Sequence, residues 1–456
     1  MKNASENSSV MQFYNIIIGR YNELGLKSKK VRARMEYSLL DHISKVCKRE
    51  GLNLISSFRR FGRLIFHFPT EQIPKALVVF QNVIGLYSIS PGFSVDPNYE
   101  LILDSALKLA SFYIEHNDTF AVRASRIKAF PHTSLEIERE IGGSIHDDFT
   151  DKGKKLIVDL SNPDKTIYIE VREKHAYIYT EKIPTIWGGN PIETDKAVIA
   201  LFKGYKGENV ATQLMIRRGA IVEPVIFLAD SLGLTKNNEE YYKIIKNIEQ
   251  NARYLSESMK LIILDVEPLI KQIQQDNIPE HDLEYYYKFA TMILFENLRK
   301  NLNASGQIVY KKKRLYFKGL ITAIDLSDEF SYLVGQQVTP VHFMPLIGLS
   351  QKMINDLDIR LREQYNTSTP PVQKGNTENE RKKSKFSLGQ TVVFENSLLK
   401  DESDQKLTFD NKSTVNLIEK IQEIKSYFEK DNIYSLINQI VNNNDIQEIF
   451  GKILKE

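Results

Sequence analysis

The chain has 456 residues, of which 42% are hydrophobic and 26% charged, as in proteins that fold around an apolar core. Its 61 basic and 58 acidic residues leave a formal net charge of only +3. This balance excludes a chain that is basic throughout, so any RNA site must come from local clusters of Lys and Arg.

Several features are absent from the sequence, and their absence limits the expected location of the protein and its expected metal chemistry. No apolar run approaches the roughly 20 residues that span a membrane. The polar N-terminus, MKNASENSSV, has no apolar region of a signal peptide, so we expect a cytoplasmic protein with no membrane partner. One cysteine, Cys47, and eight scattered histidines predict no disulfide within the chain and no metal site.

The first elements form a small α+β pattern. Residues 11–22 contain an apolar run that predicts a strand, and a helical pattern follows over 35–43. Residues 63–68 alternate as a strand does, and a second helix over 76–80 precedes a third strand that ends near Gly92. Strand–helix–strand–helix–strand within about 80 residues is typical of a ferredoxin-like domain.

The next segment carries a second α+β pattern. A helix begins at Thr133 with a capping box, since Glu136 lies three residues later, and Gly142-Gly143 predicts its end. The other predicted elements are a helix over 101–114 and strands over 119–125, 155–160, 166–171 and 176–179.

A Pro/Gly-rich tract over 184–191 then predicts a domain boundary. Beyond it, apolar strands alternate with helices, which indicates an open parallel sheet covered by helices. The predicted strands are 198–202, 221–227, 261–266, 320–324 and 341–345. After a polar stretch without periodicity, helices are expected over 417–428 and 433–449, either packed on the body or docking a partner.

One stretch, ALFKGYKGENVATQLMIRRGA (200–220), combines an apolar run, a glycine-containing loop and a helical pattern. Backbone N–H groups at such a helix start form the usual binding site for a nucleotide phosphate. This loop, however, contains no Asp, Ser or Thr. The candidate nucleotide-loop residues are Lys203, Gly204, Tyr205, Lys206, Gly207 and Glu208.

Several stretches resemble the tRNA 4-thiouridine synthases, also called tRNA sulfurtransferases. RYNELGLKSKKVRARME (20–36) resembles the opening of their N-terminal ferredoxin-like domain. TFAVRASRIKAFPHTSLEIEREIGG (119–143) and VDLSNPDKTIYIEVREKHAYIYTEKI (158–183) resemble a THUMP domain, an RNA-binding module of tRNA-modifying enzymes. Residues 200–218 resemble the family's PP-loop, the phosphate loop of ATP pyrophosphatases. The resemblance extends over residues 12–365.

This resemblance implies the domain organisation. The N-terminal half is expected to be α+β, with a ferredoxin-like domain (11–95) and a THUMP domain (96–185). An α/β PP-loop-like domain with an open parallel sheet (195–365) is expected to follow. A linker (366–386) would then lead to a C-terminal helical extension (387–456).

The resemblance also implies a function. In this family the first two domains grip the acceptor end of tRNA, and the PP-loop domain adenylates a uridine with ATP and Mg²⁺. Sulfur from a cysteine persulfide then replaces the adenylate. We therefore expect tRNA as the partner, although solvated surface charge is the alternative explanation for the basic residues. The predicted RNA-binding residues are Lys27, Lys29, Arg32, Arg123, Arg126, Lys128, His132 and Thr133.

The family's PP-loop reads Ser-Gly-Gly-x-Asp-Ser, and this chain departs from it. Gly204 is retained, but Gly207 stands at the Asp position and Glu208 at the final Ser position. Cys47 lies in the first domain, on a predicted helix, where a structural role is the simpler interpretation. The PP-loop-like domain has no cysteine, and residues 322–327 replace a later Gly-Glu-Ser stretch. We therefore expect the adenylation and sulfur-transfer residues to be lost, with no catalytic residue to name.

The main hypothesis is a tRNA-binding protein of tRNA thiolation that holds tRNA for a separate catalytic or sulfur-carrier protein. One alternative is an active ATP-dependent tRNA uridine 4-sulfurtransferase that takes sulfur from an external carrier, with Lys203 and Lys206 attracting phosphate. Another is a regulatory scaffold that keeps only the fold and does not bind RNA.

Overall fold

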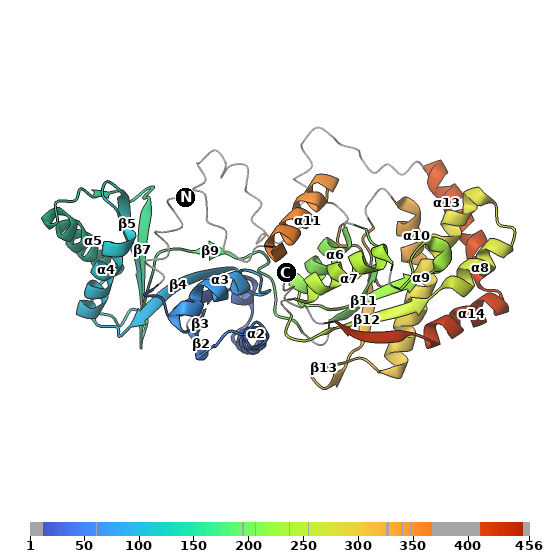
Figure 1. The fold of residues 1–456 in the computed structure, drawn as a ribbon, viewed down its shortest axis with the longest axis horizontal. Coiled ribbons are helices and arrows are strands. Elements are labelled where there is room, and N and C mark those ends of the chain that lie inside the picture. The colour runs from blue at the N-terminus through green and yellow to red at the C-terminus, as the bar shows by residue number, and fades with distance from the viewer. Residues whose placement is uncertain are drawn as a thin grey trace. The chain divides into compact units, whose positions relative to one another are not determined.

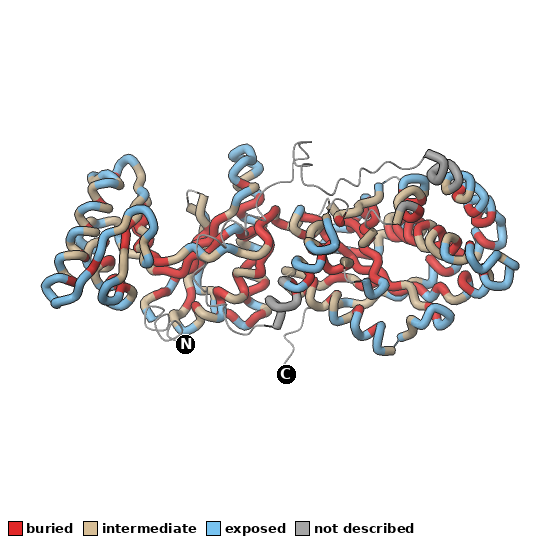
Figure 2. Tube along the Cα trace, turned by 90° about the horizontal axis from the view of Figure 1, so that it is seen from above, coloured by how far each residue is buried: buried red, intermediate tan, exposed pale blue. Residues whose placement is uncertain are grey.

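A computed structural model describes residues 12–60, 62–193, 196–205, 207–236, 238–253, 255–324, 328–338, 341–346, 349–366 and 411–449. The chain divides into two compact units, the first ending at Asn190 and the second beginning at Pro191 (Figure 1). In each unit the buried residues concentrate along the strands (Figure 2). Nearly all of the predicted linker, and the first part of the extension, lie outside the described residues.

The first part of unit 1 has the βαββαβ order of a ferredoxin-like domain. Its antiparallel strands lie in the order β2-β3-β1-β4. Strand β2 has no counterpart among the elements predicted from sequence, because its residues SSFRR are polar and it is the edge strand. The elements are β1 (Ile16–Arg20), α2 (Lys29–Arg49), β2 (Ser56–Arg60), β3 (Arg63–His67), α3 (Ile73–Gln81) and β4 (Ser88–Val95).

The second part of unit 1 continues the same sheet in the order β4-β8-β7-β5-β6. Strand β4 joins the two parts, because its first residues pair with β1 and its last with β8. Gly92 sits where the pairings meet, and a Cβ there would lie 2.5 Å from the Ile178 carbonyl oxygen. The further elements are α4 (Tyr99–Tyr113), β5 (Thr119–Arg126), α5 (Ser134–Asp151), β6 (Ile157–Val158), β7 (Lys165–Val171), β8 (Ala176–Tyr179) and β9 (Ile183–Pro184).

Helix α5 corrects one expectation. It runs to Asp151 and does not end at Gly142-Gly143. Each glycine in a helix interior costs about 1 kcal/mol relative to alanine. Burial of one continuous apolar face outweighs this cost, because the helix buries Ile137, Ile141, Ile145 and Phe149 at a spacing of four residues.

Unit 2 is an α/β fold around the predicted open sheet. Its strand order is β16-β15-β10-β11-β12-β17, and every pairing up to β12 is parallel. Its elements before the C-terminal segment are β10 (Ala197–Phe202), α6 (Gly207–Arg217), β11 (Ile221–Leu228), α7 (Glu239–Ala252), β12 (Met259–Asp265), α8 (Glu267–Gln275), α9 (Glu280–Ser305), β13 (Val309–Tyr310), β14 (Lys313–Arg314), β15 (Phe317–Ile321), α10 (Glu329–Val338), β16 (His342–Phe343) and α11 (Gln351–Asn366).

The C-terminal segment packs on unit 2. Helices α13 (Asn411–Phe428) and α14 (Asp431–Asn442) contribute side chains such as Ile424 and Ile437 to the core around α9. The predicted helix over 433–449 is wrong at its end, because α14 stops at Asn442 and Asp445–Ile449 forms strand β17, antiparallel to β12. Among the described helices, none is long and apolar enough to cross a membrane.

Candidate nucleic-acid interface and nucleotide loop

The first group of predicted RNA-binding residues lies at the start of α2. Lys27 and Lys29 are exposed, and Arg32 is half-buried one turn into the helix. Within the described residues the Ser28 side chain makes no capping hydrogen bond, and the first turn holds no acidic residue. A helix N-terminus carries partial positive charge and open N–H donors. Added cations make this end of α2 suited to an anion such as a phosphate.

The second group surrounds the start of α5, where the donors are partly engaged. The Thr133 Oγ1 accepts a hydrogen bond from the Glu136 N–H at 3.2 Å, and the Glu136 carboxylate accepts one from the Thr133 N–H at 2.7 Å. This capping box confirms the sequence prediction but places a carboxylate at the helix N-terminus. His132 stacks on Tyr99 with 4.3 Å between ring centroids.

The remaining predicted residues follow strand β5. The Arg123 guanidinium donates to the Leu160 carbonyl, and Arg126 donates to the carbonyls of Ile127 and Lys128 at 3.1 and 2.7 Å. Both arginines are half-buried, whereas Lys128 is exposed. Lys128 is therefore the cation of this group that is most open to a phosphate.

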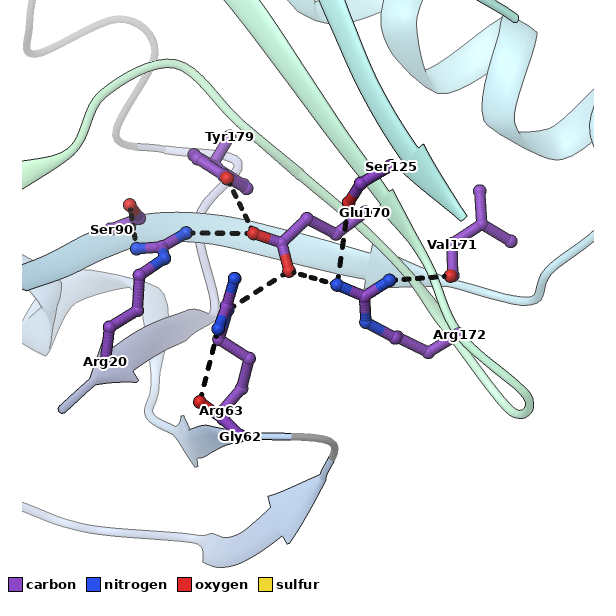
Figure 3. Close-up of polar contacts among 9 residues, drawn as sticks. All are labelled: Arg20, Gly62, Arg63, Ser90, Ser125, Glu170, Val171, Arg172 and Tyr179. Atoms are coloured by element: carbon purple, nitrogen blue, oxygen red, sulfur yellow. Dashed lines mark hydrogen bonds and ion pairs between the residues drawn. The ribbon is translucent and has the colours of Figure 1, made fainter. Parts of the chain in front are cut away.

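A cluster that the sequence analysis did not single out joins the two parts of unit 1. The buried Glu170 of β7 accepts hydrogen bonds from Arg20 at 3.2 Å, Arg63 at 3.2 Å, Arg172 at 2.9 Å and the Tyr179 hydroxyl at 2.8 Å (Figure 3). We call Arg20, Arg63 and Arg172 the guanidinium cluster. They come from β1, from β3 and from the residue after β7, so the contacts tie the ferredoxin-like strands to the later ones.

The charge of Glu170 is fixed by this cluster. Burial alone would raise the pKa of Glu170, but the guanidinium groups of Arg63 and Arg20 hold it at about 2. Glu170 is therefore ionised at physiological pH. Its neighbour Arg172 lies two residues on in the IEVR motif, but the sequence gives no sign that Arg20 and Arg63, more than 100 residues away, meet them.

The nucleotide loop of unit 2 contains its own anion. Gly204 has φ +95°, a conformation that favours glycine. The Glu208 carboxylate accepts hydrogen bonds from the Lys203 N–H at 2.7 Å and the Gly204 N–H at 3.0 Å. Burial raises the pKa of Glu208 to about 7, even though these backbone donors act to lower it. Lys206 lies outside the described residues.

The other described loop residues are a glycine at the start of α6 and two exposed residues. Gly207 begins α6, and a Cβ at this position would lie 2.5 Å from Leu346 Cδ1. The Leu346 side chain would therefore have to shift to admit a larger residue at this position. Lys203 is exposed and donates to Thr291 Oγ1 at 3.5 Å, and Tyr205 is 64% exposed. As arranged here, Glu208 occupies two N–H donors that a phosphate would use.

Neither a reactive thiol nor a metal site is found in the described part of the chain. Cys47 is buried in α2, and burial raises the pKa of its thiol to about 12, so it is a thiol at neutral pH. No three His, Cys, Asp or Glu side chains in the described ranges gather so as to hold a metal ion.

Three family models match the chain in sequence. The ThiI ferredoxin-like domain matches residues 16–90, the THUMP domain 98–181 and the thiamine biosynthesis protein (ThiI) 193–309. The first two matches fall on the shared sheet of unit 1, and the third includes the nucleotide loop.

Curated relatives point in the same direction. A probable tRNA sulfurtransferase of Thermococcus kodakarensis is 29% identical over 75% of this chain and 87% of that protein. A probable tRNA sulfurtransferase of Methanosarcina acetivorans is 33% identical over 46% of this chain, which spans about half (50%) of that protein.

The fold resembles that of a solved relative. A crystal structure of a 4-thiouridine synthetase–RNA complex with bound ATP aligns with a TM-score of 0.65, over 96% of this chain and 100% of that one. At 17% sequence identity this likeness concerns the fold alone.

Proposed function

Because the chain belongs to the tRNA sulfurtransferase family, with ferredoxin-like, THUMP and ThiI domains, we propose that it binds tRNA and acts in the thiolation of a tRNA uridine. The observation that best supports tRNA binding is the uncapped, basic start of α2, which lies in the same unit as the THUMP match. Helix dipole, open N–H groups and lysines act together there on a phosphate.

The first candidate for the chemistry is an active ATP-dependent tRNA uridine 4-sulfurtransferase supplied by an external sulfur carrier. The comparisons support this candidate best, because the ThiI model covers the loop and both relatives described above are named as probable sulfurtransferases. In this case Glu208 must leave the loop donors before ATP and Mg²⁺ bind. The sulfur must come from outside, because Cys47 is a buried thiol.

The second candidate is a protein that holds tRNA for a separate catalytic or sulfur-carrier protein. One observation favours it: the Glu208 carboxylate takes the N–H donors of Lys203 and Gly204. Gly207 also stands where the family places its aspartate. A protein of this kind grips tRNA without using ATP.

Substitution of Glu208 tests what the loop does. In the Glu208→Ser variant we expect pyrophosphate to bind at least tenfold more tightly than in the wild type, because a carboxylate no longer competes for the loop donors. Isothermal titration measures this affinity. Glu239→Gln, which removes one exposed carboxylate from the start of α7, is the control and should change nothing. Equal affinities in the wild type and Glu208→Ser contradict our view of the loop.

The wild-type protein then separates the two candidates. ATP binding in the presence of tRNA and Mg²⁺, with 4-thiouridine formed when a persulfide donor is added, identifies the enzyme. Binding of tRNA without ATP binding or product identifies the tRNA-holding protein. If the wild type binds no tRNA, both candidates fail and the scaffold hypothesis remains.

A further inference from the structure

The guanidinium cluster holds more positive charge than its surroundings neutralise. Within the described residues, the ion pairs of Arg20, Arg63 and Arg172 all go to one carboxylate, that of Glu170. Three guanidinium groups against one carboxylate leave a surplus of two positive charges. Their side chains are only 11%, 29% and 14% exposed, so water screens this surplus poorly.

Hydrogen-bonding capacity also remains in the cluster. Within the described residues, Arg63 uses Nε for Glu170 and Nη1 for the Gly62 carbonyl, so its Nη2 is left for another acceptor. In the described structure, the Nε of Arg172 is buried without a hydrogen-bond partner. Arg63 is the most exposed of the three, which makes it the entry point for a ligand. The cluster is thus short of one anionic acceptor.

The surroundings extend the positive charge. Lys182 lies 4.0 Å from the centroid of the Tyr168 ring, and burial and the charge of Arg20 both lower its pKa. Burial and the Glu36 carboxylate, which accepts a hydrogen bond from the Tyr21 hydroxyl, raise the pKa of Tyr21, whereas Arg32 of α2 and Arg63 of the cluster act in the opposite direction. Arg63 of the cluster and Arg32 of α2 therefore both lie near Tyr21.

We propose that the guanidinium cluster is a seat for one phosphate group of bound RNA, next to the phosphate site at the start of α2. A guanidinium group offers paired donors that match the oxygens of a phosphodiester, and the single negative charge of the phosphodiester offsets one of the two surplus positive charges. This inference rests on the proposed tRNA binding. It adds residues from β1, from β3 and from the position after β7, which lie outside the groups predicted from sequence.

The test measures binding of a full-length tRNA transcript to the full chain by fluorescence anisotropy at several salt concentrations. Arg63→Gln is expected to weaken binding about tenfold at low salt and to reduce the slope of log K against log salt by roughly 0.7 to 0.9, the loss of one phosphate contact. Arg172→Gln should act in the same direction. Arg139→Gln is the control, because Arg139 is 76% exposed on α5 and should change binding less than twofold.

Several outcomes distinguish this inference from the function on which it rests. If the wild type binds no tRNA, the proposed function fails and the phosphate seat with it. If the wild type binds and neither variant changes the salt slope, only the seat is overturned. If polyglutamate displaces the tRNA at equal charge concentration, the seat is a site for acidic protein and the inference is wrong.

A second measurement needs no variant, in case Arg63→Gln or Arg172→Gln melts at a lower temperature by circular dichroism. Phenylglyoxal modifies accessible guanidinium groups, and mass spectrometry locates the modified residues. Bound tRNA should protect Arg63 of the wild type at least fivefold while Arg139 reacts as before. Equal reactivity of Arg63 with and without tRNA overturns the proposal.

Discussion

At the scale of single residues, the buried carboxylate of Glu170 links several strands of unit 1. It takes four donors from β1, β3, β8 and the end of β7, while its own backbone belongs to the sheet. Replacement of a buried ion-pair partner leaves the opposite charge both desolvated and unpaired, which costs about 3–5 kcal/mol. Here three guanidinium groups lose their shared partner.

We therefore expect Glu170→Ala to lower the free energy of unfolding of unit 1 by about 3–5 kcal/mol. The single tryptophan, Trp187, is buried in unit 1, so its fluorescence during urea unfolding reports on this unit. Glu140→Ala is a suitable control, because Glu140 is 39% exposed and its ion pairs are long, so less than about 1 kcal/mol should be lost. A loss equal to that of the control would show that Glu170 is not structurally important.

The Glu208 carboxylate occupies backbone donors of the nucleotide loop, and this feature could be predicted from the sequence. The sequence placed a carboxylate at a helix start where a phosphate is expected, and the structure shows its oxygens on the N–H groups of Lys203 and Gly204. This part of the site was predictable, because the loop and the carboxylate are five residues apart. The guanidinium cluster was not, because it depends on the pairing of β4 with both β1 and β8.

At the scale of elements, apolar strands were predicted well and polar edge strands were missed. Strand β8, Ala176–Tyr179, is fully buried and its predicted bounds agree with the structure. The missed strands β2 and β17 lie at sheet edges, where burial of one face leaves no apolar run to find. The end of α5 was misplaced because a local glycine signal was weighed above the buried face of the helix.

Strand β17 covers the edge of β12, so its removal should expose that edge. Its residues add backbone pairing from Ile449 to Asp445, and ion pairs join Lys260 to Glu448 and Lys236 to Asp445. A chain that ends at Asn444 exposes the β12 edge, and exposed edges pair with other chains. We expect this chain to melt several degrees lower than the full chain and to form oligomers.

Size-exclusion chromatography with light scattering measures the mass, and circular dichroism measures the melting temperature. The matched control is a chain that ends at Ile449, which keeps the strand and removes only the residues after it. If the two truncated chains behave alike, pairing by β17 does not protect the edge of β12.

At the scale of the whole molecule, the net charge is small, but the two units differ in where their notable charged groups lie. Unit 1 has cations at the start of α2 and in the guanidinium cluster, so salt should steeply weaken the proposed RNA binding even though the whole chain carries only +3. Unit 2 buries two carboxyl groups whose pKa values are raised by burial, Glu208 in the nucleotide loop and Glu223 in the central strand β11.

Glu170 in unit 1 and the two buried carboxyl groups in unit 2 should contribute to stability with opposite dependence on pH. The pKa of Glu170 is held at about 2, below its ordinary value of 4.5, so its stabilisation of unit 1 is present above pH 4.5 and is lost as the pH falls towards 2. Burial raises the pKa of Glu208 to about 7 and that of Glu223 to about 8. The contribution of these two carboxyl groups to the stability of unit 2 is therefore greatest near pH 4.5 and is lost as the pH rises to 8.

The Glu223→Gln variant tests the larger of the two raised pKa values in unit 2, that of Glu223. The Glu223 side chain accepts a hydrogen bond from the Lys260 N–H, which a glutamine oxygen can also accept. At pH 8 we expect the variant to unfold with a free energy up to about 4 kcal/mol higher than the wild type, because no carboxylate need be buried with its charge. At pH 5 the two should agree within about 1 kcal/mol. Urea unfolding followed by circular dichroism, with Trp187 fluorescence marking unit 1, measures both. A difference of equal size at the two pH values would show that the glutamine acts through packing and not through the charge of Glu223.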